Sequence, residues 1–259
     1  MWWSIVGLGG NCFISSTDKK IALKGYQMWE DSECRAWCEH NSEKELAREA
    51  FIYKHLGNHP HILYYYGLEE VHPGINSLRL EYAPLGDVRK FIREHKAAPL
   101  TKGIRLRMAL DTALGLSHIH ARKVQHCDMS CRNLFLFDNY RVKIGDFGGS
   151  LIEGYDELEP GVCEEAAYEL PLRGRELWGR PARGRELFAL GSAIYEIMAW
   201  ALPYEGLEDD EIEKRYAAEE FPTLEGIPLV SNIIRMCWEE KYESVDKVVE
   251  ALQAFITSQ

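Results

Sequence analysis

Two short motifs at a fixed interval constrain this chain more than any other feature of its sequence. Residues 126–133 read His-Cys-Asp-Met-Ser-Cys-Arg-Asn, and an Asp-Phe-Gly motif begins at Asp146, thirteen residues after Asn133. The apolar runs at residues 133–137 and 142–144 predict two short strands with an Asp-Asn turn between them. An ordinary hairpin with polar ends is one interpretation, but two motifs at this interval favour a functional site.

This span resembles the catalytic core of a eukaryotic protein kinase. In that family an aspartate that accepts a proton stands five residues before an asparagine that binds magnesium, and the aspartate of Asp-Phe-Gly binds magnesium too. The resemblance implies that Asp128 faces the acceptor hydroxyl and that Asn133 and Asp146 are metal ligands. These residue types suit phosphoryl transfer, which needs oxygen ligands for Mg²⁺ and a carboxylate that orients the hydroxyl and takes its proton.

A kinase of this kind also needs a glycine-rich turn, a strand lysine and a helical glutamate upstream, and the sequence contains all three in that order. Residues 4–14 predict a strand, a turn and a strand, in which Gly7 and Gly9 would let backbone amides approach the triphosphate of ATP. The run Ile-Ala-Leu-Lys that ends at Lys24 resembles the family's third-strand motif, so Lys24 would pair the α and β phosphates.

The predicted partner of Lys24 is Glu49, on a helix expected over residues 42–56. Ser42 and Glu45 form a capping-box pattern at the start of this helix, and apolar residues recur along it at helical spacing. The alternative for Glu49 is an ordinary solvated helix acid. The motifs downstream favour the pairing with Lys24.

Residues 78–87 resemble the fifth strand of the family and the hinge between its two lobes. This places Leu80 at the gatekeeper position and the backbone groups of Glu81 and Ala83 against the adenine edge. Four apolar residues match the positions that sandwich the purine, namely Val6, Ile14, Ala22 and Phe135. All four could equally be core residues. Asp87 could either bind the ribose or cap the helix that follows it.

The C-terminal half favours a protein kinase over small-molecule phosphotransferases of the aminoglycoside type, which share a similar set of polar residues. Residues 185–197, then Pro203 and Tyr204, then residues 235–238 resemble helices F to H of the large lobe. The resemblance spans residues 4–257 and is closest in wording to short fungal serine/threonine protein kinase-like proteins.

At 259 residues and 46% hydrophobic composition, the chain can bury a large core and has room for one such domain. We expect an α+β, bilobal protein-kinase fold in a single domain over residues 1–259. A small β-rich N-lobe with one helix would extend to about residue 83, and a larger, mainly helical C-lobe would occupy about residues 84–259.

The net charge and the cysteines limit the binding partners and the cellular compartment that we expect. The formal net charge of −11 argues against binding to nucleic acid or to an anionic membrane, and no signal peptide or membrane-spanning run is evident. Seven cysteines are an odd number, and Cys127 and Cys131 lie inside the catalytic motif, so we expect free thiols and a soluble monomer in the cytoplasm or nucleus. Cys34, Cys38 and His40 lack a fourth metal ligand, which favours a surface segment before the predicted helix.

Four positions depart from the family's pattern. Cys12 replaces the third glycine of the phosphate loop, Cys127 replaces the arginine before the catalytic aspartate, and Glu186 replaces the aspartate of helix F. The Ala-Pro-Glu motif that ends the activation segment is missing, with residues 172–174 near its place. In the family that glutamate pairs with an arginine, and in this chain Val245 stands close to the place of the arginine. Both partners are therefore missing, and we expect the ion pair to be absent.

The acidic segment at residues 153–169 occupies the place of the activation segment. Because Cys127 replaces the arginine that receives a loop phosphate in many kinases, a phosphate switch of that kind lacks its receptor. We expect the segment to be ordered by packing instead.

The sequence therefore predicts an enzyme, an ATP-dependent protein kinase that uses ATP and Mg²⁺ and acts on a protein substrate. Serine/threonine specificity is favoured, although Ser130 stands where such kinases usually have lysine and Arg132 matches many tyrosine kinases. The alternatives are an ATP-binding pseudokinase that acts as a scaffold or regulator, and a small-molecule kinase.

Overall fold

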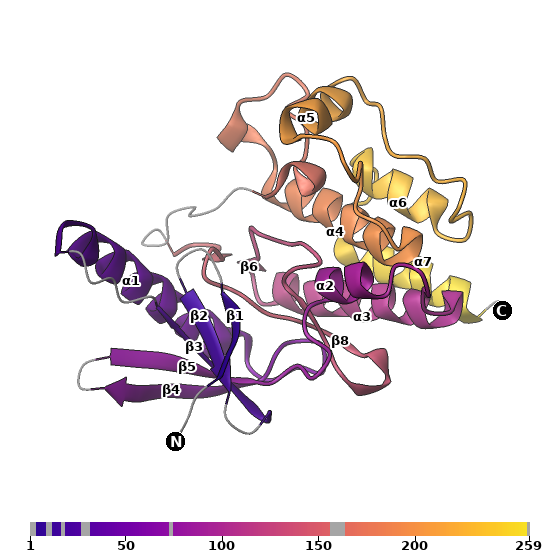
Figure 1. Ribbon diagram of the computed structural model, residues 1–259. Helices are drawn as coiled ribbons and strands as arrows, with labels where there is room; N and C mark the ends of the chain where they lie inside the picture. The colour runs from indigo at the N-terminus through magenta and orange to yellow at the C-terminus, as the bar shows by residue number, and fades with distance from the viewer. Residues whose placement is uncertain are drawn as a thin grey trace.

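The computed structural model describes residues 4–8, 12–16, 19–26, 32–72, 75–155 and 164–257. Figure 1 shows a sheet with one long helix at the N-terminal end of the chain and a group of helices at the C-terminal end. The elements of the N-terminal part are β1 Ser4–Leu8, β2 Cys12–Ser16, β3 Ile21–Tyr26, α1 Ser32–Leu56, β4 Tyr65–His72 and β5 Ile75–Glu81. The helices of the C-terminal part are α2 Val88–Glu94, α3 Lys102–Ala121, α4 Ala182–Ala199, α5 Asp209–Ala217, α6 Ser231–Trp238 and α7 Val245–Thr257.

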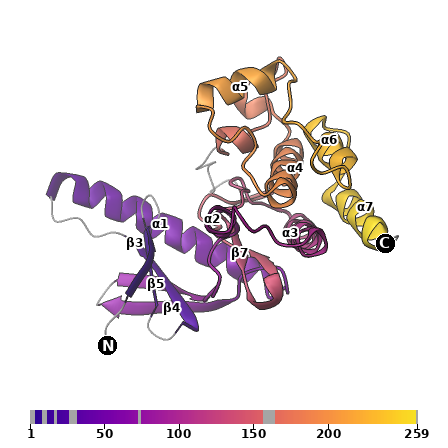
Figure 2. The same cartoon turned by 45° about the vertical axis from the view of Figure 1, so that its right-hand side comes forward.

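The N-terminal part is an antiparallel sheet in the order β1-β2-β3-β5-β4, and α1 packs against it (Figure 2). Leu46, Ala50, Tyr53 and Leu56 form the buried stripe of α1, because residues three and four apart share a helix face. This stripe meets buried residues of the sheet such as Leu78. The resulting lobe confirms the predicted small, sheet-containing unit with one helix.

The start of α1 differs from the prediction. The helix begins at Ser32, ten residues before the predicted start at Ser42, so the capping-box pattern of Ser42 and Glu45 lies inside a continuous helix. The serine and glutamate of that pattern are also tolerated within helices, and the ten residues before them contain no proline or glycine to stop the helix. Cys34, Cys38 and His40 therefore belong to α1 rather than to a segment before it, and their side chains lie outside the described ones.

The C-terminal part is built around α4, whose residues from Arg185 to Met198 are buried. α3 packs against α4 and α7, and α6 packs against the other side of α4 (Figure 2). At Gly191 a Cβ atom would lie 2.7 Å from the Cβ of Cys237, so the absence of a side chain lets α4 and α6 approach closely. Trp238 fills the same contact and is fully buried.

Short strands connect the two parts. β7 Leu134–Leu136 pairs with β8 Val142–Ile144, and a 3₁₀ turn at Asp138–Tyr140 joins them, which confirms the predicted hairpin. The Ile144 amide donates to the carbonyl of His61, and the Ile144 carbonyl accepts from the amide of Leu63. The hairpin is thus bonded to the chain between α1 and β4. The α+β, bilobal arrangement agrees with the prediction.

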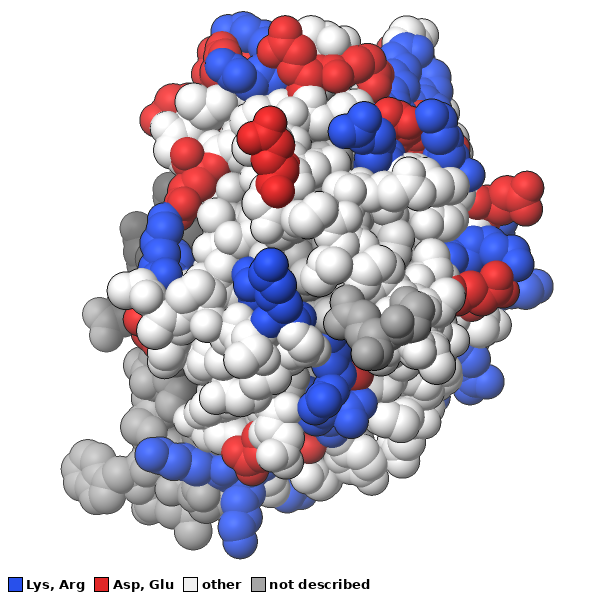
Figure 3. Space-filling view, turned by 90° about the vertical axis from the view of Figure 1, so that its right-hand side faces the viewer, with Lys and Arg blue, Asp and Glu red and all other residues white. Residues whose placement is uncertain are grey.

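The exterior carries mixed charge. On the face drawn in Figure 3, lysine and arginine side chains lie in separate places among aspartate and glutamate, with uncharged surface between them. That face therefore presents no continuous basic patch of the kind that attracts a phosphate backbone. Among the described residues, no helix is long and apolar enough to cross a membrane.

Candidate functional site

Lys24 stands at the centre of an ion-pair triad between the two lobes. Its Nζ lies 2.7 Å from Oε2 of Glu49 and 2.7 Å from Oδ1 of Asp146. β3 supplies the lysine, α1 the glutamate, and the loop after β8 the aspartate. Glu49 also accepts a hydrogen bond from the Phe147 amide at 3.3 Å, so one carboxylate joins α1 to both the strand and the Asp-Phe-Gly segment.

The charges around this triad favour an ionised carboxylate at Asp146. Burial raises the pKa of Glu49, and Lys24 opposes that rise. Desolvation alone would raise the pKa of Asp146 too, but Lys24, His126 and the Gly148 amide together hold it below its ordinary value. The Asp146 side chain is still 42% exposed. An ionised, accessible carboxylate of this kind suits a magnesium ligand.

The loop between β6 Val124–Gln125 and β7 holds the other two motif residues in contact. Nδ2 of Asn133 donates to the Asp128 carbonyl at 2.7 Å and to its Oδ2 at 2.9 Å. The buried ring of His126 supports the loop, because Nδ1 lies 3.3 Å from the Asp128 amide and Nε2 lies 3.0 Å from the Gly145 carbonyl. Burial raises the pKa of Asp128, and His126, Asn133 and Arg132 partly offset the rise. A raised pKa favours proton acceptance.

The donor set fits a magnesium ion shared with a nucleotide. The amide nitrogen of Asn133 is committed to Asp128, which leaves the side-chain oxygen as the atom available for a cation. The described residues contain no group of three or more His, Cys, Asp or Glu side chains that could hold a metal alone. Magnesium in nucleotide sites is commonly held by one or two protein oxygens and completed by phosphates and water, so Asn133 and Asp146 satisfy this pattern.

A cavity of about 620 Å³ opens beside this cluster. Its lining includes Lys24, Glu49 and Asp146, the chain after β5, and residues of α2. The cavity includes four of the predicted adenine contacts, namely Ala22, Glu81, Ala83 and Phe135, and the predicted gatekeeper Leu80. A cavity that combines apolar side chains with a charged cluster suits a nucleotide, which has an aromatic base and a charged triphosphate.

Several predicted nucleotide contacts cannot be placed. The backbone of Val6 and Gly7 lies in β1 and that of Ile14 in β2, but the side chains of Val6 and Ile14 are not among the described ones. Gly9 lies outside the described residues altogether. The Cys12 backbone belongs to β2. The roles predicted for these residues therefore stay predictions.

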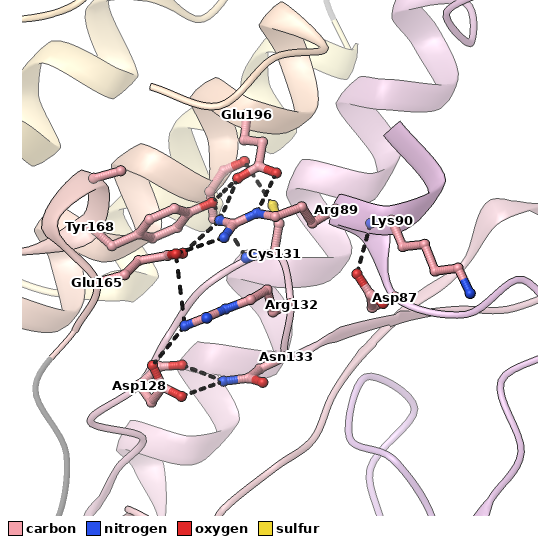
Figure 4. Close-up of polar contacts among 12 residues, drawn as sticks. Asp87, Arg89, Lys90, Asp128, Cys131, Arg132, Asn133, Glu165, Tyr168 and Glu196 are labelled. Carbon is pink, nitrogen blue, oxygen red and sulfur yellow. Dashed lines mark hydrogen bonds and ion pairs between the residues drawn. The ribbon is translucent and has the colours of Figure 1, made fainter. Parts of the chain in front are cut away.

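Asp87, for which the sequence left two roles open, caps α2. Its Oδ1 accepts a hydrogen bond from the Lys90 amide at 2.8 Å (Figure 4). It also lines the cavity, so the capping role does not remove it from the nucleotide site.

The departure at Glu186 is compensated locally. Glu186 accepts hydrogen bonds from the amides of His126 at 3.0 Å and Cys127 at 2.9 Å, and thus holds the loop that carries Asp128. Cys127 adopts a left-handed backbone with φ of 66° and is buried. Cys127, Cys131 and Cys237 are free thiols, as predicted, and burial raises the pKa of each well above its ordinary value.

The family's ion pair at the missing Ala-Pro-Glu motif is absent, as predicted, but a different ion pair joins the same two regions. Arg173 and Arg175 follow Leu172, and both bind Glu240 just after α6, with nitrogen-to-oxygen distances of 2.5 and 2.8 Å. Val245, which stands close to the place of the family's arginine, is buried in the core. The described chain therefore retains a charge pair between these two regions with the signs reversed, because the arginines now lie on the activation segment.

Sequence reasoning also missed a second group of charged residues beside Asp128. Arg89 of α2 binds Glu165 of the activation segment and Glu196 of α4 (Figure 4). The one sign of this group in the sequence is that Arg89 and Glu196 stand among apolar residues. Charged residues on a buried helix face must be paired, so this setting indicates that each has a partner. The sequence could not name their partners.

Comparison with known proteins identifies related sequences. Residues 16–253 match the family described as protein tyrosine and serine/threonine kinase. The serine/threonine/tyrosine-protein kinase HT1 of Arabidopsis thaliana is 26% identical over 237 residues, which cover 86% of this chain and 57% of that protein. The lymphokine-activated killer T-cell-originated protein kinase of Homo sapiens is 30% identical over 218 residues, covering 80% and 67%. The human tyrosine-protein kinase ABL2 is 25% identical over 228 residues, covering 83% and 18%.

The chain thus spans 57% and 18% of the lengths of the plant kinase and of ABL2. These relatives include a serine/threonine/tyrosine kinase and a tyrosine kinase. The likeness to fungal proteins stays a prediction.

Proposed function

The chain belongs to the protein tyrosine and serine/threonine kinase family, and from this premise we propose that it is an active enzyme that transfers the γ-phosphoryl group of ATP to a protein hydroxyl. The observation that carries the proposal is the complete Lys24, Glu49 and Asp146 triad beside a cavity of about 620 Å³. A scaffold that never bound nucleotide would have no need to hold three charged groups together at this depth, because burying charges is costly.

Each residue has a role that follows from its place. Lys24, held by Glu49, binds the α and β phosphates, and the apolar cavity with the Glu81 and Ala83 backbone receives the adenine. Asn133 and Asp146 would hold magnesium, which when bound neutralises negative charge on the phosphates. Asp128 orients the acceptor hydroxyl and takes its proton.

Serine and threonine are the acceptors we favour, in a single domain that acts as a monomer in the cytoplasm or nucleus. The support is the sequence around Asp128, which apart from Arg132 does not resemble that of tyrosine kinases. The names of the relatives include both classes, so the acceptor must be determined directly.

The test is a phosphotransfer assay on the purified protein. We would incubate it with labelled ATP and Mg²⁺ and with peptide libraries in which serine, threonine or tyrosine is the fixed acceptor. Lys24→Met is the loss-of-function variant, and Lys247→Met, in a solvent-exposed ion pair on α7, is the matched control. We expect transfer by the wild type and by Lys247→Met, and none by Lys24→Met.

A thermal-shift measurement separates the main alternatives. An ATP and Mg²⁺ shift without transfer to any acceptor would favour the pseudokinase. Transfer confined to small alcohols would favour a small-molecule kinase. No shift with ATP in large excess would exclude both nucleotide-binding proposals.

A further inference from the structure

Arg89 is a buried cation held between two carboxylates from distant parts of the chain. Its Nε and Nη2 donate to the two oxygens of Glu196 at 2.9 and 2.8 Å. Its Nη1 donates to Oε2 of Glu165 at 2.7 Å, and Nη2 lies 2.6 Å from the other oxygen. Arg89 is 9% exposed and Glu196 is 1% exposed. The two-point contact with Glu196 fixes the orientation of the Arg89 guanidinium, and the hydrogen bond from that guanidinium holds Glu165 in a defined place relative to α2 and α4.

Further bonds tie this group to the loop that carries Asp128. The Tyr168 hydroxyl donates to Glu196 and accepts from the Cys131 amide at 3.4 Å. The Arg89 amide donates to the Cys131 carbonyl at 3.2 Å. Figure 4 shows these residues converging from α2, α4, the activation segment and the loop after β6. The position of the activation segment at Glu165 is therefore coupled to the position of the loop.

Arg132 extends this group to the proposed catalytic base. Its Nη2 lies 3.7 Å from Oε2 of Glu165 and 3.9 Å from Oδ1 of Asp128. These separations exceed hydrogen-bond length, so the interactions are electrostatic. The Arg132 side chain is 52% exposed and flexible by nature, and Glu165 is the second carboxylate that keeps its guanidinium beside Asp128 (Figure 4).

Glu164, the residue before Glu165, also forms an ion pair. Glu164 binds Arg185 at 2.8 Å, and both side chains are buried. Arg185 precedes Glu186, which holds the Cys127 amide. Adjacent carboxylates of the activation segment thus bind arginines from α4 and from α2, in the region where Cys127 has removed the family's phosphate-receiving arginine.

We propose that Glu165 is a positioning residue for phosphotransfer. Held by Arg89, its carboxylate keeps Arg132 beside Asp128 and so replaces the activation-segment phosphate of other kinases. The inference rests on the proposed function. It predicts that Glu165 contributes to the chemical step through Arg132, and that it contributes little to nucleotide binding, because it is absent from the residues lining the nucleotide cavity.

The test compares Glu165→Gln with Glu169→Gln. Glu169 lies in the same segment, its side chain is 22% exposed like that of Glu165, and it binds Arg180 at 2.7 Å, away from Asp128. We expect Glu165→Gln to lower kcat about tenfold while KM for ATP and the thermal shift with ATP and Mg²⁺ stay within about twofold of wild type. Glu169→Gln should leave kcat within about twofold of wild type. Equal kcat values for Glu165→Gln and wild type would overturn the proposal.

Arg132→Gln keeps the proposal testable if Glu165→Gln does not fold, because Arg132 is half-exposed. We expect the same loss of kcat, about tenfold, and a double variant no slower than the slower single variant. An Arg132→Gln variant as fast as wild type, or losses that multiply in the double variant, would each contradict the coupling. A wild-type protein that transfers no phosphate would instead overturn the proposed function, which is a separate outcome of the same assay.

Discussion

Glu186 accepts a hydrogen bond from the backbone amide of Cys127 at 2.9 Å, across 59 residues of sequence. The same carboxylate accepts from the His126 amide at 3.0 Å and lies 2.9 Å from Nε2 of His120. Two buried amides that follow one another in the loop therefore depend on a single side chain. The glutamate at this position, a departure from the family's aspartate, still reaches the loop that positions Asp128.

This arrangement predicts a specific dependence of stability on pH. Burial alone would raise the pKa of Glu186, but His120, His126 and the Cys127 amide hold it below its ordinary value of 4.5. Because the unfolded chain then binds this proton more tightly than the folded chain, Glu186 contributes stability above pH 4.5 that is lost as the pH falls through the lower, folded pKa. From about pH 5 down to about pH 3, the melting temperature of Glu186→Gln should fall less steeply than that of wild type.

The matched control is Glu213→Gln, on an exposed position of α5. Its melting temperature should follow the wild-type slope. Glu49, whose pKa is raised by burial, acts in the opposite direction but is unchanged in all three proteins. Parallel curves for wild type and Glu186→Gln would show that Glu186 is not the group that titrates.

The sequence predicted the elements that local patterns encode. The β7 and β8 hairpin and the β-rich N-terminal lobe follow from apolar alternation, turn residues and the family resemblance. For Asp87 the sequence offered capping as one of two roles and could not choose between them. The start of α1 was missed because a capping-box pattern is a local signal that also occurs within helices, and only tertiary context decides between the two.

The missed contacts share a different cause. Arg89 is 76 residues from Glu165 and 107 residues from Glu196. Arg173 is 67 residues from Glu240. No periodicity links partners at such separations, and the apolar setting of Arg89 and Glu196 indicates burial without naming the partner of either residue. The reversed pair at Arg173 could not be predicted from a motif defined by the opposite signs.

Asp128 should matter to chemistry far more than to nucleotide binding. It lies in the loop after β6, hydrogen-bonded to Asn133, and is not among the residues that line the nucleotide cavity. Asp128→Ala should abolish measurable transfer and retain most of the thermal shift produced by ATP and Mg²⁺. A variant that phosphorylates at the wild-type rate would remove Asp128 from the mechanism. Loss of the thermal shift would place it in nucleotide binding instead.

Arg173 should stabilise the C-terminal lobe. It donates to Glu219, to Glu240 and to the Trp238 carbonyl, and its side chain is 19% exposed. Arg173→Ala removes all of these bonds and should lower the free energy of unfolding by about 1–3 kcal/mol. Urea unfolding measures this as a lower midpoint with an unchanged slope. Lys214→Ala, which breaks the fully exposed pair with Asp210, is the control and should leave the midpoint unmoved. Equal midpoints for Arg173→Ala and wild type would mean that the reversed pair is not a stabilising contact.

Activity should not require phosphorylation of the activation segment. Between Asp146 and Arg185 the only hydroxyl side chains are Ser150, Tyr155 and Tyr168. Ser150 and Tyr168 are fully buried, and their hydroxyls donate to the His126 carbonyl and to Glu196. A kinase could reach them only after the segment had left its place, which leaves Tyr155 as the accessible hydroxyl, at 49% exposure against the ring of Phe51.

The corresponding experiment compares initial rates of phosphatase-treated and untreated protein with those of Tyr155→Phe, which keeps the ring contact with Phe51 and removes only the hydroxyl. Tyr168→Phe is unsuitable as a phosphorylation control, because it would also break the bond to Glu196. We expect equal rates in all three samples, since Glu164 and Glu165 already supply the negative charges that bind Arg185, Arg89 and Arg132. A tenfold fall in both the treated protein and Tyr155→Phe, about 1.4 kcal/mol in the barrier, would mean that a phosphate on Tyr155 completes the site and that the carboxylates alone are not sufficient.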